Sequence, residues 1–188
     1  AHLPAPPRRL LLVSSTTVYG QLDGSWVDED SPTEPRSFAG RRMLEAEALA
    51  LHSGAPCVIV RFGGIYGPGR ERMLRKVRAG EPCPAEPPLY TNRIHRDDCV
   101  SVLAHLARPD IAPGVYLAVD DEPCTQCELM DWLAQRMGLP RPARIAAPPG
   151  GLRGSNKRCR NAKLKATGFR LRYPSYREGY EALLAAGA

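Results

Sequence analysis

Three short, continuous apolar runs constrain most strongly what this chain can fold into. They occupy residues 9–14, 57–62 and 115–119. Runs that do not alternate with polar residues are typical of parallel strands covered on both faces. Between them lie segments whose composition predicts helices over residues 37–53 and 98–107. This alternation of strands and helices predicts an α/β fold with a mainly parallel sheet.

Glycine and proline divide the rest of the chain into further elements. Helices are also expected over residues 70–78, 125–137, 160–167 and 175–186. Loops are expected over residues 21–35, 81–88 and 140–154, where Pro and Gly are frequent. A capping box formed by Thr125 and Glu128 predicts where the helix over residues 125–137 begins.

Composition places the chain among globular proteins, with 43% hydrophobic and 24% charged residues. No apolar run approaches the roughly 20 residues that span a bilayer, so we expect no membrane partner and a cytoplasmic location. Much of the net charge of +6 comes from a basic segment over residues 153–172. No recognised nucleic-acid motif accompanies these cations, which favours a solvated face over a nucleic-acid site. A phosphate-bearing small ligand is the intermediate alternative.

The six cysteines show no obvious disulfide framework. Cys57 and Cys99 lie in apolar surroundings and are expected to be small buried residues. Cys124 and Cys127 have the spacing of a metal or redox pair, but no second pair follows at a suitable distance. We therefore expect a reduced, inert pair and no metal site.

Three motifs occur in a recognisable order along the chain. They are Ser14-Ser15-Thr16-Thr17-Val18-Tyr19-Gly20, Arg61-Phe62-Gly63-Gly64-Ile65-Tyr66-Gly67-Pro68-Gly69 and Ile94-His95-Arg96-Asp97-Asp98. With them the chain resembles the extended short-chain dehydrogenase/reductase superfamily. More narrowly, it resembles an atypical branch of the NAD-dependent epimerase/dehydratase family. The resemblance implies a partial Rossmann-type sheet over residues 1–119 and a small, helical, substrate-side subdomain over residues 120–188.

The resemblance begins in the middle of the family's fold. Residues 9–14 correspond to the fifth strand of its sheet, so the chain resembles the C-terminal portion of such a protein. The family binds NAD or NADP through a glycine-rich turn after its first strand, and no such turn is present in this chain. The strand over residues 9–14 would then be an uncovered sheet edge, which predicts poor stability alone or self-association through that edge.

The family's catalytic tyrosine and lysine lie four residues apart on one helix face. The corresponding positions here are Ala39 and Met43, or Phe38 and Arg42 if the register shifts by one. None of these side chains can replace the tyrosine as a proton donor. Ser15 corresponds to the family's catalytic serine, although a hydroxyl at this strand end can equally satisfy backbone groups.

Further site residues follow from the resemblance. It implies cofactor contacts at Ser14, Phe62, Gly63 and Gly64, and it leads us to expect substrate contacts at Tyr19, Tyr66 and Arg70. Both tyrosines have the alternative of a packed residue, and Arg61 that of a structural cation. His95 is either a catalytic base or a packed residue at a strand end.

These residues lead to two functional hypotheses. The first is an atypical NAD(P)-binding epimerase/dehydratase-family protein that acts on or binds a nucleotide-sugar-like small molecule. The alternative is a non-catalytic binding or scaffold protein that retains the Rossmann fold.

Overall fold

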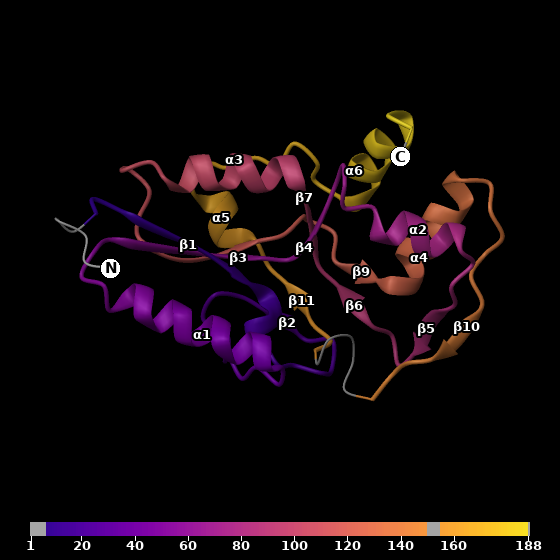
Figure 1. Cartoon of the computed structure of the whole chain (residues 1–188), viewed down its shortest axis with the longest axis horizontal. Coiled ribbons are helices and arrows are strands. Elements are labelled where there is room, and N and C mark those ends of the chain that lie inside the picture. The colour runs from indigo at the N-terminus through magenta and orange to yellow at the C-terminus, as the bar shows by residue number, and fades with distance from the viewer. Residues whose placement is uncertain (1–6, 150–154, 188) are drawn as a thin grey trace.

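A computed structural model describes residues 7–149 and 155–187 (Figure 1). At its centre is a three-stranded sheet of β1 (Leu10–Ser15), β3 (Cys57–Phe62) and β8 (Gly114–Ala118), in the order β1-β3-β8. Both pairings are parallel. The three apolar runs therefore form the predicted strands, and the predicted α/β class with parallel strands is confirmed.

Helices cover both faces of this sheet. Figure 1 shows α1 (Phe38–Leu51) on one side, with α3 (Arg96–Leu106) and α5 (Ala162–Ala166) on the other. Side chains of β3 alternate between the two layers, because successive residues of a strand point to opposite faces. Cys57 and Ile59 pack in the cluster that includes Ala50 of α1, whereas Val58, Val60 and Phe62 pack with residues of α3 and α5.

A second core lies beside the sheet. It is built around α2 (Arg72–Arg78), α4 (Gln126–Arg136) and α6 (Tyr176–Ala185), and its buried residues include Leu74, Leu129 and Leu183. The boundary at residue 119 between two domains stays a prediction, and this core takes residues from both sides of it. The small subdomain is therefore not one continuous stretch of sequence.

The other strands of the described structure form short pairs. They are β2 (Trp26–Val27) with β11 (Arg158–Cys159), β4 (Gly64–Tyr66) with β7 (Arg93–His95), β5 (Cys83–Glu86) with β10 (Arg144–Ala146), and β6 (Tyr90–Thr91) with β9 (Cys124–Thr125). Three of these strands, β2, β5 and β10, lie in segments that the sequence predicts as loops. The expectation is wrong there because such short strands are fixed by distant partners and not by local periodicity. Residues 150–154 of the expected loop lie outside the described residues.

The helices agree closely with the sequence. Each predicted helix is present, with its ends moved by two residues or fewer. Thr125 and Glu128 form the predicted capping box at the beginning of α4. Within the described part of the chain, none of the helices combines the length and apolar character that crossing a membrane requires.

The cysteines differ from the expected pattern. Cys127 forms a disulfide with Cys83, which links α4 to β5, while Cys124 is free and buried. The expectation of a reduced Cys124/Cys127 pair is therefore wrong, because sequence spacing cannot reveal a partner 44 residues away. Cys57 and Cys99 are buried, as predicted. Among the described residues there is no group of three or more potential ligands that could hold a metal ion.

Candidate functional site

A buried ion pair joins α1 to the end of β3. Glu47 and Arg61 are only 3% and 5% exposed. The guanidinium of Arg61 donates to both carboxylate oxygens of Glu47, through Nη2 at 2.7 Å and Nε at 3.0 Å. The Ser14 hydroxyl donates to the same carboxylate. This bidentate geometry, with an additional hydrogen bond, is the arrangement in which buried charges are best compensated.

Tyr19 extends this network toward the following loop. Its hydroxyl accepts a hydrogen bond from Arg61 Nη1 at 2.7 Å and donates to the backbone oxygen of Asp28 at 2.7 Å. Burial raises the pKa of Tyr19 well above the ordinary value, although the charge of Arg61 acts in the opposite direction. Both hydrogen-bonding roles of the phenol are taken, so the geometry favours the packed alternative. Substrate contact by Tyr19 stays a prediction.

Ser15 lies at the carboxyl end of β1, beside Phe62 of β3 in the sheet register. Its side-chain oxygen accepts a hydrogen bond from the backbone N–H of Thr17 at 3.2 Å, which caps the short 3-10 helix η1 (Thr16–Val18). The hydroxyl is half-buried and keeps its proton available for a second contact. The structural alternative for Ser15 is therefore observed, and the catalytic one stays a prediction.

The end of β3 exposes backbone beside Ser15. Gly64 is exposed, and its N–H donates to the carbonyl oxygen of Asn92 at 2.8 Å. A Cβ at Gly63 would lie 2.9 Å from Val119 and 3.0 Å from the Asn92 oxygen, so no larger residue fits there without a shift. Phe62 is buried among the residues under α3, so contact between Phe62 and a cofactor would have to involve its backbone. The same holds for Ser14, whose hydroxyl is bonded to Glu47.

His95 and Tyr66 belong to an aromatic stack. The Tyr66 ring stacks on Tyr180 with 4.5 Å between centroids, and His95 lies between Tyr66 and Tyr173. His95 Nδ1 accepts a hydrogen bond from the backbone N–H of Asp97, and burial lowers the pKa of His95. His95 is thus a packed residue at the end of β7. Tyr66 is also buried, with its hydroxyl 3.5 Å from the backbone oxygen of Ser175, and substrate contact there stays a prediction.

Arg70 differs from the two tyrosines. It is exposed, and its backbone N–H donates to the Gly67 oxygen at 2.8 Å, which closes the turn after β4. Among the predicted substrate contacts, this side chain is therefore the most accessible to a ligand.

The sequence gives no sign of a buried carboxylate at Asp120. This residue follows β8 and is 2% exposed, and neither carboxylate oxygen has a hydrogen-bond partner in the described part of the molecule. Burial raises the pKa of Asp120 to about 8, even though the nearby Arg93 favours the ionised form. The Arg93 guanidinium donates instead to Cys124 Sγ at 3.3 Å and to Thr91. Only the folded chain places Asp120 in an enclosed position.

Two asparagines that sequence reasoning missed tie the site segments together. Asn156 accepts from the backbone N–H of Tyr90 at 2.8 Å, and its own backbone N–H donates to the Gln21 oxygen at 2.7 Å. Asn92 donates to the backbone oxygen of Lys157 at 3.0 Å and accepts from the N–H of Cys159 at 2.6 Å. The segment after residue 154 is therefore fixed against the loops that follow β1 and precede β7.

Solved structures of other proteins share the fold of this chain. A structure described as an NAD-dependent epimerase/dehydratase of Methylobacillus flagellatus is 44% identical and covers 97% of this chain, with a TM-score of 0.82. A conserved protein of unknown function from Silicibacter pomeroyi is 38% identical over 95% of the chain, with a TM-score of 0.84. The chain spans 65% and 67% of these two proteins. The chain is thus similar in sequence and fold to a protein of the NAD-dependent epimerase/dehydratase family.

Other similar proteins have a lower sequence identity to this chain. MoeE5, solved in complex with UDP-glucose and NAD, is 28% identical and covers 93% of this chain, with a TM-score of 0.75, and the chain spans 62% of its length. The curated 3-diazoavenalumate denitrifying reductase of a Streptomyces species is 27% identical over 155 residues. The chain spans about half of that relative, or 51% of its length. No family model matches the chain.

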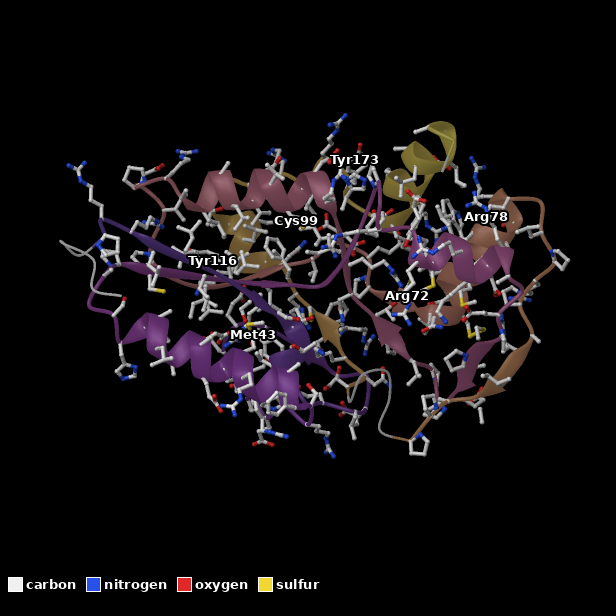
Figure 2. All side chains as sticks on the ribbon, viewed as in Figure 1. Met43, Arg72, Arg78, Cys99, Tyr116 and Tyr173 are labelled. Atoms are coloured by element: carbon white, nitrogen blue, oxygen red, sulfur yellow. A yellow bond between two sulfur atoms is a disulfide. The ribbon has the colours of Figure 1, made fainter. Side chains whose placement is uncertain are left out.

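The helix α1 carries the positions that correspond to the catalytic tyrosine and lysine of the similar family. Ala39 is exposed in the first turn of the helix. Met43 packs against the cluster of Val18, Tyr19, Val27, Leu117, Val119 and Cys159. Figure 2 shows the Met43 side chain on the side of α1 that faces the strands. In the first of the two predicted registers, the methyl group of Ala39 and the thioether of Met43 stand where the resemblance implies the tyrosine and the lysine.

Proposed function

We propose that this chain forms part of the active site of an atypical NAD(P)-dependent epimerase/dehydratase-family enzyme that acts on a nucleotide-sugar-like small molecule. One observation carries the proposal. Ser15 and the exposed backbone of Gly64 lie together at the carboxyl ends of the adjacent parallel strands β1 and β3. Ligands of open α/β sheets bind outside such strand ends. MoeE5, which shares the fold at 28% identity, was solved with UDP-glucose and NAD.

The residues at this edge fit the nicotinamide end of a dinucleotide. Gly64 is exposed and has no side chain to block a flat ring, while the Ser15 hydroxyl lies on the neighbouring strand. Gly63, Phe62 and Ser14 would contribute backbone surface, because the Phe62 and Ser14 side chains are turned into the protein. When bound, the dinucleotide would supply or accept a hydride.

The family's usual proton-transfer pair is replaced in this proposal. Neither Ala39 nor Met43 carries an ionisable group. The network of Ser14, Glu47, Arg61 and Tyr19 is nevertheless complete, which supports a preserved active-site scaffold. A general acid must then come from another element of the chain.

The substrate would lie across the same strand ends. Arg70 is exposed and carries a permanent charge suited to a phosphate oxygen. Tyr19 and Tyr66 would shape the site through their rings. We place the chain in the cytoplasm and assign substrate contacts to the region after residue 119 together with Arg70.

Calorimetry on the full-length protein tests this function. NAD, NADPH and UDP-glucose are each titrated into the protein, and we expect heat from at least one dinucleotide and from UDP-glucose. Gly64→Val places a branched side chain where the ring would lie, so it should weaken dinucleotide binding by about tenfold or more. Ala48→Val, at an exposed position of α1, is the matched control and should leave binding unchanged.

The absence of heat for both dinucleotides would overturn the proposal. The remaining reading would then be a non-catalytic binding or scaffold protein. The loss of ionisable groups at Ala39 and Met43 is the observation that favours this second candidate.

A further inference from the structure

Lys157 is a buried cation with few partners. Lys157 is only 4% exposed. Among the residues that the structure describes, its ammonium makes one hydrogen bond, to Ser155 Oγ at 2.8 Å. An ammonium has three donors, and two of them have no hydrogen-bond partner among the described residues. No carboxylate in the described ranges forms an ion pair with it. A buried charge of this kind is costly unless something compensates it.

The position of Lys157 links it to the residues missing from α1. Lys157 and Cys159 are both buried and lie on either side of Arg158, where the short strand β11 begins. Lys157 and Cys159 therefore face the same side, as alternate residues of an extended chain do. Cys159 belongs to the cluster against which Met43 packs. The Lys157 side chain therefore lies on the same side of the sheet as Met43, where the resemblance implies a lysine.

A second set of contacts ties Lys157 to the proposed cofactor edge. Asn92 donates to the backbone oxygen of Lys157 at 3.0 Å. The backbone oxygen of the same Asn92 accepts from the Gly64 N–H at 2.8 Å and would touch a Cβ at Gly63. One residue therefore fixes Lys157 relative to the turn where the nicotinamide ring is proposed to lie.

We propose that Lys157 is the proton donor of this active site, and that its ammonium contacts the substrate oxygen on the carbon that exchanges hydride. This inference rests on the proposed function. The free donors of the ammonium would then bind that oxygen, which compensates the buried charge. Lys157, which comes from a distant segment of the sequence, would then replace the catalytic tyrosine and lysine that α1 lacks.

The proton-transfer step is balanced. A bound dinucleotide would supply the hydride, and the substrate oxygen on the same carbon would then need a proton. An N–H bond of the Lys157 ammonium breaks and an O–H bond forms on that oxygen, which leaves a neutral amine hydrogen-bonded to Ser155. In the opposite direction, the amine accepts the proton from the hydroxyl group.

The electrostatic surroundings support such a transfer. Burial lowers the pKa of Lys157 below that of an ordinary lysine, while Cys159 acts weakly in the opposite direction. The Cys159 thiol is itself neutral near pH 7, because burial raises its pKa to about 12. The negative charge of Glu29 also raises the pKa of Cys159. A lowered lysine pKa brings proton release closer to physiological pH, where a general acid is most effective.

NMR of the full-length protein with ¹³C-labelled lysine side chains tests this inference. The Lys157 Cε signal is assigned as the one that disappears in Lys157→Met. We expect it to titrate at lower pH than an ordinary lysine, because burial lowers the pKa of Lys157. The exposed Lys163 provides a second signal for comparison. NAD together with UDP-glucose should shift the Lys157 signal, and it should leave that of Lys163 unchanged. Lys163→Met serves as the matched control for assignment and binding.

Affinity gives an independent measurement. Lys157→Met should weaken UDP-glucose binding by about tenfold, the size expected for loss of one hydrogen bond to a charged group. Lys157→Arg keeps a cation and should therefore retain binding, whereas a loss that comes only from disrupted local folding would not be rescued by arginine. Probes that bind while the Lys157 signal and its titration stay unchanged overturn the inference alone. A protein that binds neither dinucleotide nor UDP-glucose overturns the proposed function and this inference with it.

Discussion

Two buried charge clusters in this molecule are built in opposite ways. Under the end of β1, Glu47 and Arg61 are joined by two hydrogen bonds and are supported by Ser14 and Tyr19. After β8, Asp120 has a cation nearby but neither carboxylate oxygen has a hydrogen-bond partner among the described residues. The first cluster holds its charges, whereas the second favours a protonated carboxyl. Burial alone does not determine ionisation, since the hydrogen bonds available to each form decide it.

The largest expected effect comes from breaking the complete cluster. Arg61→Met removes the only cation paired with the buried Glu47 in the described ranges, and should reduce the free energy of unfolding by about 3–5 kcal/mol. Urea denaturation measures the change. Arg42→Met is the control, because Arg42 pairs with Glu45 on the exposed face of α1 and should change stability by about 0.5 kcal/mol or less. Equal effects for the two variants would contradict the comparison.

The incomplete cluster should appear as a pH dependence. The pKa of Asp120 is raised to about 8 in the folded chain, so the folded state holds this proton after the unfolded chain has lost it. Stability should therefore fall as pH rises from about 4 to about 8. Asp120→Asn cannot ionise and should flatten this slope. Denaturation series at several pH values compare the two proteins, and parallel curves would contradict the assignment.

A smaller effect separates the two buried phenols. Tyr19→Phe leaves a guanidinium N–H and the Asp28 carbonyl oxygen without a partner, which should cost about 1–3 kcal/mol. Tyr66→Phe removes only a long contact of 3.5 Å to the Ser175 oxygen and should cost about 0.5 kcal/mol or less. Thermal denaturation of both variants provides the measurement. A larger loss for Tyr66→Phe would show that the two hydroxyls are misassigned.

The smallest effect on stability is expected at the edge strand. Within the described structure β1 pairs only with β3, and Val13 is 51% exposed. We expect the chain of this sequence to self-associate through this strand. Val13→Lys should reduce the concentration dependence seen in sedimentation while changing stability by about 0.5 kcal/mol or less. A wild-type chain that sediments as a monomer at all concentrations would rule out association through β1.

Much of the fold follows from local patterns. The strands β1, β3 and β8 and the helices between them are visible in the sequence because their apolar periodicity extends over several residues. The short strands β2, β5 and β10 are not, since each depends on a partner far along the chain. The position of Ser15 at the end of β1 follows from the motif that contains it. The disulfide of Cys83 with Cys127 does not follow from spacing.

The candidate site divides in the same way. The sequence by itself determined that Ala39 and Met43 cannot donate a proton, because neither side chain has an ionisable group in any conformation. Only the tertiary structure decided which charges are compensated. Glu47 binds Arg61, 14 residues later in the sequence, and Asn92 donates a hydrogen bond to the backbone oxygen of Lys157, 65 residues after it. Burial and hydrogen bonding, which set both pKa and cost, are properties of such distant contacts and not of local sequence.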